Sequence, residues 1–353
     1  MPISTIVRED IKVIVESLSS DLQTFTGKSV LVTGGCGFLG RYLIATLLEM
    51  NENLSIPCKV ICADTFITSS REQAIFDSDD PNFTLLEHDV CVELPQHIRP
   101  DYIIHAAGLA SPFYYRKHPI DTMRVSVEGT RTLLDRARFA GTSKIIYFSS
   151  SEIYGDPVPE CIPTPETYWG NVSCLGPRAC YDESKRLGET ICSVYQSLYG
   201  VPVSIVRPFN VYGPGGLAAQ DFRVIPAFLT AAFAGKKMPV HGKGNQTRTF
   251  CYMTDAIVGF FKVLLHGRPG EAYNIGHNQD EINVISLAHV ITELIGGGTQ
   301  ELVDYPETYP AGEPQRRCPD LSKAQRELHF SPTIDLRSGL IRTIQWYRES
   351  QLI

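Results

Sequence analysis

Short, largely apolar runs alternate with longer stretches of helical periodicity from residue 28 onward. Such apolar runs are typical of strands that are buried on both faces of a parallel sheet. The predicted strands are Ser29–Val32, Lys59–Ala63, Phe83–Leu86, Tyr102–Ile104, Lys144–Phe148 and Val203–Val206. Helical patterning covers Arg41–Met50, Pro119–Ala140 and Tyr181–Leu198 between them. The alternation predicts an α/β fold, a Rossmann-type doubly wound parallel sheet whose ligands bind at the carboxyl ends of the strands.

The pattern changes at both ends of this region, which predicts three parts. Residues 1–26 form an N-terminal extension with an amphipathic helix over residues 7–22, packed on the main body or on a second subunit. Residues 27–206 form the dinucleotide-binding domain. Residues 207–353 contain Pro/Gly turns, a helix at Val224–Ala234 and a terminal helix at Leu336–Glu349. We expect this last part to be a smaller α/β substrate-binding lobe, with about 248–278 returning to the sheet.

Composition narrows the class of partner. The 353 residues carry a formal net charge of −7, which disfavours binding to nucleic acid or to anionic membranes. No segment is apolar enough to span a membrane, and charged residues interrupt any signal sequence at the N-terminus. The ten cysteines are scattered without a CxxC pair. They predict reduced thiols in a cytoplasmic protein, and no metal site.

A glycine-rich loop follows the first predicted strand. Gly35-Cys36-Gly37-Phe38-Leu39-Gly40 has the G-x-G-x-x-G spacing and opens a helix, the context in which this motif binds a dinucleotide pyrophosphate. Asp64 ends the next strand, where a carboxylate binds the adenosine ribose hydroxyls and repels a 2′-phosphate. The pattern therefore favours NAD over NADP. Arg41 and Arg71 are the residues that could weaken this preference.

Tyr181 and Lys185 are four residues apart at the start of a predicted helix and therefore share one helical face. The Lys185 ammonium is expected to lower the pKa of the Tyr181 phenol, so that a phenolate can take a proton from a substrate hydroxyl. Ser150 lies at the end of the fifth strand and could hydrogen-bond the same oxygen.

These motifs occur together with His105-Ala106-Ala107, Ser149-Ser150-Ser151-Glu152 and Arg207-Pro208-Phe209-Asn210. The set resembles the extended short-chain dehydrogenase/reductases, which modify nucleotide-activated sugars. With Tyr181 and Lys185, the expected NAD contacts are Gly34, Gly37, Phe38, Leu39, Gly40, Asp64, Asp89, Val90, Ala106, Ala107, Ser149 and Pro208.

Three further stretches, at 154–157, 168–183 and 244–250, resemble the UDP-glucuronate decarboxylase (UDP-xylose synthase) family. The resemblance implies that Tyr181 is the base and Lys185 its partner, and that a nucleotide-diphosphate sugar is the substrate. It places Ser150, Ser151, Glu152 and Arg248 around the sugar ring. It places Asn210, Arg223, Arg248 and Arg317 near the diphosphate. It also implies a homodimer, formed through the helices at 119–140 and 181–198.

Three alternatives stay open. A sugar 4,6-dehydratase needs an acid to expel water, and Ser151 is a poor proton donor at that position. A 4-epimerase is favoured by Pro214-Gly215-Gly216, where the decarboxylases carry Pro-Arg-Met, and Ser126 stands where Asn is usual. A non-catalytic dinucleotide-binding protein would not need Ser150, Tyr181 and Lys185 together. Glu152 could also be only a cap or an ion-pair partner at the strand end.

Overall fold

The computed structural model describes residues 4–70, 75–76, 79–216, 223–305 and 314–350. Its centre is a sheet of seven parallel strands in the order β11-β6-β5-β4-β1-β2-β3. The strands are β1 (Ser29–Thr33), β2 (Lys59–Asp64), β3 (Phe83–Glu87), β4 (Tyr102–His105), β5 (Lys144–Phe148), β6 (Val203–Pro208) and β11 (Ala272–Ile275). The order reverses between β1 and β4, and this doubly wound topology confirms the predicted Rossmann-type α/β class.

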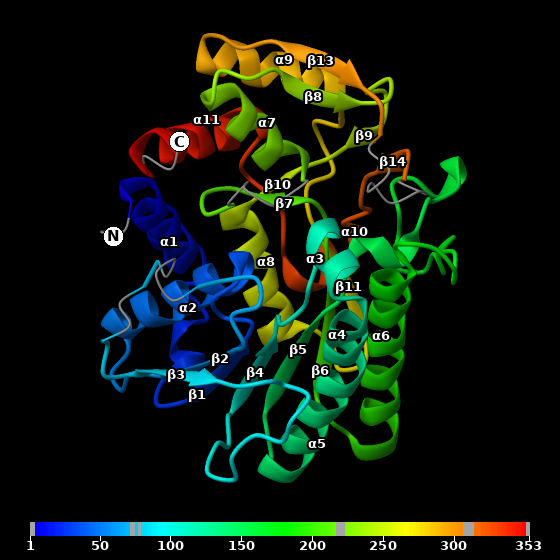
Figure 1. The fold of residues 1–353 in the computed structure, drawn as a ribbon. Coiled ribbons are helices and arrows are strands. Elements are labelled where there is room, and N and C mark those ends of the chain that lie inside the picture. Colours follow the sequence, from blue (N-terminus) through cyan, green and yellow to red (C-terminus); the bar gives the residue numbers. More distant parts are fainter. Residues whose placement is uncertain (1–3, 71–74, 77–78, 217–222, 306–313, 351–353) are drawn as a thin grey trace.

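Helices cover both faces of the sheet (Figure 1). One face packs on α2 (Phe38–Met50) and α8 (Met253–His266), and the other on α5 (Thr130–Ala140) and α6 (Ala179–Tyr199). Alternate strand residues divide between the two cores: Val30 and Val32 face the first, and Leu31 faces the second. The apolar strand runs in the sequence follow from this burial on both faces.

The predicted helix at 119–140 is interrupted. It consists of α4 (Pro119–Arg124), one π turn (Val125–Gly129) and α5. Gly129 lies so close to Val90 that an added Cβ would be 2.7 Å from the valine Cγ2. The π turn therefore lies where the helix passes the end of β3, and Val125 lines the large cavity described below. A second short helix, α3 (Pro112–Lys117), precedes it.

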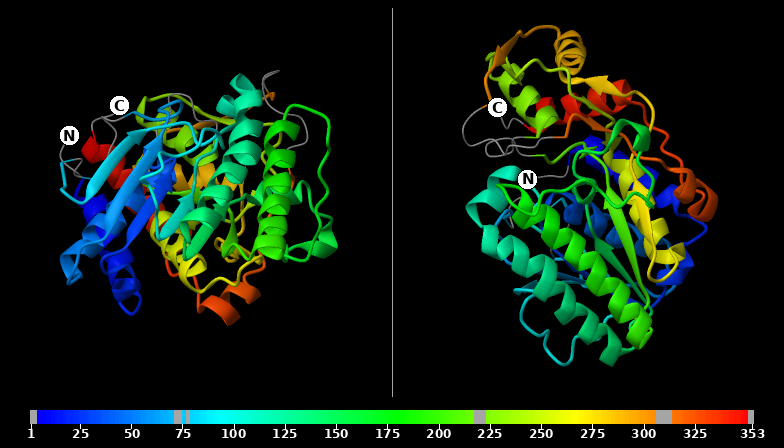
Figure 2. Two further views of the ribbon diagram at one scale, coloured as in Figure 1. Left: turned by 90° about the horizontal axis from the view of Figure 1, so that it is seen from below. Right: turned by 90° about the vertical axis from the view of Figure 1, so that its right-hand side faces the viewer.

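The smaller lobe stands over the carboxyl ends of the strands (Figures 1 and 2). Its helices are α7 (Val224–Phe233), α9 (Val284–Ile295) and α11 (Leu336–Ser350), whereas α10 (Ser322–Leu328) packs on β11 and α8 at the edge of the large sheet. Its small sheets are β10–β7 (Cys251–Tyr252, Val211–Tyr212), β12–β9–β14 (Ile282–Asn283, Thr247–Arg248, Arg316–Arg317) and β13–β8 (Gln300–Val303, Met238–His241). In the middle sheet, Arg248 and Arg317 are direct register partners on adjacent parallel strands. The sheet therefore brings together two arginines that are 69 positions apart in the sequence.

The N-terminal helix packs on the main body. It spans α1 (Thr5–Ser17), and a turn then leads to a 3-10 helix at Leu22–Phe25, so the expected continuous helix to residue 22 is wrong at its C-terminal end. Ser19 and Ser20 follow the helix, and serine competes with helical hydrogen bonds through its own hydroxyl. Further short 3-10 helices in the described residues are Asn51–Asn53, Ser151–Tyr154 and Pro159–Cys161.

A buried carboxylate anchors α1. Asp10 is 1% exposed and accepts hydrogen bonds from Tyr252 (2.8 Å), Tyr42 (3.4 Å) and the Nη2 atom of Arg342 (2.7 Å). These donors come from the segment before α8, from α2 and from α11. One side chain thus connects α2 and the segment before α8 to α11.

We predict that Asp10→Ala lowers the free energy of unfolding by about 3 kcal/mol, because it leaves the Arg342 guanidinium and two buried hydroxyls without their acceptor. Urea denaturation followed by circular dichroism measures the change. Glu16→Ala is the matched control, because Glu16 is exposed on the same helix; it should change stability by less than about 0.5 kcal/mol. Equal effects of the two substitutions would contradict the role of Asp10.

Candidate active site

One large cavity, of about 810 Å³, lies between the carboxyl ends of the strands and the smaller lobe. All but one of the residues predicted to bind cofactor or substrate, or to act on the substrate, line it. The exception is Arg317, which is 1% exposed and lies behind Ser151 and Glu152. The topology thus gathers residues from across the sequence into one site.

The glycine-rich loop forms one end of the cavity. Gly34 has a φ of +68°, and a Cβ there would approach the Ala107 Cα to 2.7 Å. A Cβ on Gly40 would be 2.1 Å from the Gly34 carbonyl oxygen. The loop is therefore packed as tightly as glycine allows, and α2 begins directly after it with its N-terminus at the cavity. Unpaired backbone N–H groups at such a terminus fit a diphosphate.

Asp64 ends β2 at the cavity wall. Its carboxylate accepts hydrogen bonds from the backbone N–H groups of Cys36 (2.9 Å) and Phe66 (2.8 Å). These bonds fix the carboxylate where it can meet a ribose diol. Arg41 donates to the carbonyl oxygen of Gly215 at 2.7 Å, and Arg71 lies outside the described residues.

The remaining predicted cofactor residues follow the strand ends along the same wall. They lie after β3, after β4, after β5 and at the end of β6: Asp89 and Val90, Ala106 and Ala107, Ser149, and Pro208. With Phe38 and Leu39 from the start of α2, they make a continuous lining from the glycine loop to Tyr181.

Tyr181 and Lys185 lie on the first turns of α6, and both are buried. The Lys185 Nζ atom donates to the Phe148 carbonyl oxygen at 2.7 Å and lies 5.9 Å from the centroid of the Tyr181 ring. Burial lowers the pKa of Lys185 to about 8. A lysine whose pKa lies this close to neutral pH can exchange a proton with its surroundings.

The Tyr181 phenol behaves differently from the sequence expectation. Burial raises its pKa above the ordinary value, and the hydrogen bond from Ser150 opposes the rise without cancelling it. The Tyr115 ring stacks on it, with centroids 5.4 Å apart and an interplanar angle of 16°. The net direction is opposite to the expected lowering, because removal of water from the phenol is the largest influence on its pKa.

Glu152 is the centre of a buried cluster of charges. Its Oε2 atom accepts hydrogen bonds from Arg178 and, at 3.0 Å, from the Nη2 atom of Arg317. Burial alone would raise the pKa of Glu152, but Arg317, Arg178 and Arg248 together bring it below its ordinary value. Glu152 is therefore a carboxylate at neutral pH. It is an ion-pair partner at the strand end, and it also lines the cavity.

Sequence reasoning gave no role to two members of this cluster. Arg178 lines the cavity, and Asp182 lies behind it with its Oδ2 atom 3.5 Å from the arginine Nε. Burial and the neighbouring Glu152 charge raise the pKa of Asp182 to about 7. The i, i+4 spacing of Arg178 and Asp182, inside the motif that carried the family resemblance, was the available signal.

The four residues expected at the diphosphate divide into two groups. Asn210 donates to the Thr249 carbonyl oxygen at 2.9 Å, and the Arg223 guanidinium lies 4.7 Å from the Phe38 ring centroid, at the end of the cavity with the glycine loop. Arg248 and Arg317 lie beside each other near Glu152. Arg248 is held by the carbonyl oxygens of Pro314 (2.7 Å) and Thr247 (2.8 Å).

Within the described part of the chain, no cluster of histidine, cysteine or acidic side chains could hold a metal ion. None of the helices there has the length and apolarity needed to cross a membrane.

Comparisons with known proteins agree with this geometry. The sequence profile of the NAD dependent epimerase/dehydratase family matches residues 30–276. UDP-glucuronic acid decarboxylase 3 of Arabidopsis thaliana is 38% identical over 311 residues, which are 88% of this chain and 86% of that protein. UDP-glucuronic acid decarboxylase 1 of Xenopus tropicalis is 37% identical over 322 residues, which are 91% of this chain and 72% of that protein.

Solved structures show the same fold. The crystal structure of dTDP-glucose 4,6-dehydratase from Streptomyces venezuelae, with NAD bound, matches with a TM-score of 0.80 at 27% identity, over 92% of this chain and 98% of that chain. UDP-glucose 4-epimerase from Thermotoga maritima, with UDP-glucose, matches with a TM-score of 0.81 at 25% identity, over 92% and 99%. The prediction that NAD is the cofactor is confirmed.

We predict that Asp64→Asn weakens NAD binding about tenfold, because the variant loses a hydrogen bond between a charged acceptor and a ribose hydroxyl. Binding of NADP should strengthen, because its 2′-phosphate no longer meets a carboxylate. Isothermal titration calorimetry with both dinucleotides measures the two changes. An unaltered ratio of the two affinities would remove Asp64 from cofactor selection.

Proposed function

This chain belongs to the NAD dependent epimerase/dehydratase family, and from that premise we propose that it converts UDP-glucuronate to UDP-xylose and carbon dioxide. The observation that carries the proposal is the position of Glu152. An ionised carboxylate held by Arg178 and Arg317 lines the same cavity as the Tyr181–Lys185 pair. Residues 27–206 would bind the cofactor and residues 207–353 would supply the substrate lobe.

The residues of this chain fit the first step. Tyr181 takes the proton of the sugar C4 hydroxyl, with Ser150 hydrogen-bonded to the phenol and Lys185 fixed on the next turn. NAD, when bound, accepts the hydride from C4 and later returns it. Burial raises the pKa of Tyr181, so a nearby positive charge would favour the ionised phenol that this step needs.

The second step needs no acid at the leaving group. The C4 ketone makes the glucuronate a β-keto acid, so the C5–C6 bond breaks, carbon dioxide leaves and the bonding electrons move onto the ketone oxygen. The enolate would then take a proton at C5 from solvent, and Tyr181 would return its proton to the C4 oxygen when that carbon is reduced. Glu152 is ionised, and Ser151 is a weak acid, so neither residue is suited to expel a hydroxyl group. The cluster therefore favours decarboxylation over dehydration.

The cluster around Glu152 contains three arginines and two carboxylates, and this excess of positive charge fits an anionic sugar. Arg178, Arg248 and Arg317 surround Glu152 and Asp182, and the pKa of Asp182 is raised to about 7. The excess positive charge near the cavity suits the substrate carboxylate, which Arg forks bind well. Carbon dioxide is neutral, so once it has formed the arginines no longer attract it and do not retain it in the cavity.

A 4-epimerase is the second candidate, and the Pro214-Gly215-Gly216 loop is the observation that favours it. Gly215 has a φ of +91° and accepts a hydrogen bond from Arg41. An epimerase would use the same Tyr181 chemistry without losing carbon.

We expect the purified protein, given NAD and UDP-glucuronate, to yield a nucleotide sugar lighter by the mass of carbon dioxide. Mass spectrometry reads this loss directly. A product of unchanged mass with a shifted sugar NMR spectrum would mean epimerisation and would overturn the proposal. UDP-glucose, which lacks the carboxylate, is the matched control substrate and should not lose carbon.

Tyr181→Phe should reduce turnover by about 10³-fold while cofactor affinity is retained, because the variant lacks only the proton acceptor. Steady-state rates and calorimetric titration with NAD measure the two effects. Full activity of this variant would exclude Tyr181 as the base.

We also propose a cytoplasmic homodimer. The cytoplasm is supported by the ten cysteines, all of which carry free thiols. The dimer is supported by exposed apolar side chains on α4 and α6, namely Ile120, Met123, Leu187, Val194 and Leu198.

The dimer is tested by light scattering at micromolar concentration, with a mass of about twice 39.2 kDa expected. Leu187→Glu together with Val194→Glu should give a monomer, because four buried charges per dimer would meet at the interface. A monomeric mass for the unaltered protein would refute the homodimer.

A further inference from the structure

The helix that carries Tyr181 and Lys185 has a third polar residue in line with them. Tyr181, Lys185 and Glu189 are spaced at i, i+4 and i+8 on α6, so they share one face, which points toward the ends of β5 and β6. The proposed reaction uses the first two residues and gives no role to the third.

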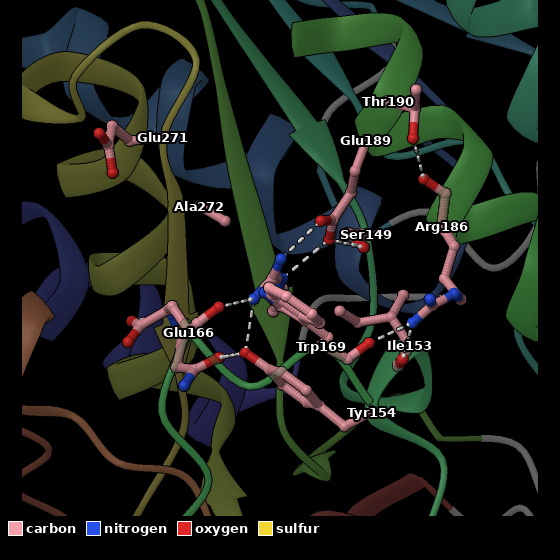
Figure 3. Close-up of polar contacts among 12 residues, drawn as sticks. Ser149, Ile153, Tyr154, Glu166, Trp169, Arg186, Glu189, Thr190, Glu271 and Ala272 are labelled. Atoms are coloured by element: carbon pink, nitrogen blue, oxygen red, sulfur yellow. Dashed lines mark hydrogen bonds and ion pairs between the residues drawn. The ribbon is translucent and has the colours of Figure 1, made fainter. Parts of the chain in front are cut away.

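Glu189 is held by both of these strands (Figure 3). Its Oε1 atom accepts hydrogen bonds from the Ser149 hydroxyl (2.5 Å) and the Arg207 Nε (2.9 Å), and its Oε2 atom accepts from the Arg207 Nη2 (2.6 Å). Ser149 follows β5 directly, and Arg207 lies in β6. The pair is nearly buried, with side chains 14% and 10% exposed. A bidentate ion pair of this kind fixes direction as well as distance.

Arg207 extends the contact to a third strand. Its Nη1 atom donates to the Tyr154 hydroxyl (2.7 Å) and to the Glu166 carbonyl oxygen (3.0 Å). The Tyr154 hydroxyl donates in turn to the Oδ1 atom of Asn274 in β11, at 2.8 Å. In Figure 3, dashed lines meet at one centre from the Tyr154 hydroxyl, the backbone carbonyl oxygen of Glu166 and the Glu189 carboxylate. The carboxyl ends of β6 and β11 are thus connected to α6 through one guanidinium group, and the end of β5 is connected to it through the carboxylate of Glu189.

The same contact bears on the catalytic lysine. Lys185 donates to the carbonyl oxygen of Phe148, and the next residue is Ser149, which Glu189 holds. α6 is therefore fixed to this strand end at two successive residues, one turn apart along the helix. We propose that Glu189 and Arg207 are positioning residues, which hold α6 on the ends of β5 and β6 so that the Tyr181–Lys185 pair keeps its place and its charge beside Ser150. The role in turnover rests on the proposed function, but the geometry does not.

The charges around Lys185 predict how its pKa should respond to substitution of Glu189 or Arg207. Burial lowers the pKa of Lys185, and Cys192 and Glu189 oppose that change. The other groups that face it are neutral at pH 7: burial lowers the pKa of His105 in β4 to about 3, and raises those of Tyr147 in β5 and Cys192 in α6. Glu189, partly balanced by Arg207 on its far side, is therefore the charge that helps to keep Lys185 protonated.

The test measures the ionisation of Lys185 by NMR in protein that carries ¹³C at the lysine ε-carbons. The signal is assigned by its loss in Lys185→Met. Glu189→Gln should lower the titration midpoint of Lys185 by about one pH unit, because an attractive charge is removed. Arg207→Gln should raise the midpoint, because Glu189 is then no longer balanced. Damage to packing alone would not move the two variants in opposite directions.

Two control variants separate the effect of charge from the effect of a lost hydrogen bond. Tyr154→Phe removes a hydrogen bond to Arg207 but no charge, so the Lys185 midpoint should stay where it is. Arg207→Lys keeps the positive charge, so the titration midpoint of Lys185 in this variant should lie close to the wild-type value. If Glu189→Gln does not fold, as judged by thermal unfolding, the two Arg207 variants still decide the matter.

Kinetics supply the second readout. The alkaline limb of the pH profile of kcat should move down in Glu189→Gln and up in Arg207→Gln, with a small change in KM, because the pair lies behind the cavity wall and does not line it. Folded variants whose Lys185 titrates at the wild-type pH would overturn the inference. A wild-type protein that leaves UDP-glucuronate unchanged would refute the proposed function only, since the NMR titration needs no substrate.

Discussion

The Lys185 ammonium group is taken out of water, and the carbonyl oxygen of Phe148 accepts its hydrogen bond at 2.7 Å. Burial of a cation costs several kcal/mol unless nearby groups replace its hydration. α6 places Lys185 one turn after Tyr181, and the bidentate ion pair between Glu189 and Arg207 holds the same helix on the strand ends. The Phe148 carbonyl replaces only part of the lost hydration, so burial still lowers the pKa of Lys185 to about 8.

The parts of the site that follow from local sequence were predictable. The G-x-G-x-x-G turn, the acid that ends β2 and the Tyr181–Lys185 spacing depend on residues close together in the chain, and the sheet topology brings them to one edge. The registry of Arg248 and Arg317 was not predictable, because it depends on a two-residue strand pairing across 69 positions. The raised pKa of Tyr181 also required three-dimensional burial, which periodicity does not report.

The cluster of charges around Glu152 contains residues from both lobes. Glu152 lies in the 3-10 helix that follows β5 and Arg178 just before α6, whereas Arg248 and Arg317 belong to the small sheet of the other lobe. A carboxylate held from both sides resists rotation and stays ionised. The same residues therefore determine both the contact between the lobes and the charge at this wall of the cavity.

The anchor at Asp10 joins the first helix of this chain to the last, and Ser4 adds a hydrogen bond to Glu349 at 2.9 Å. Asp10 and Arg342 are 332 positions apart in the sequence. Because residues are added in order during translation, the Asp10 carboxylate is made long before its arginine partner. The contact that fastens α1 to α11 can therefore form only after residue 342 has been synthesised.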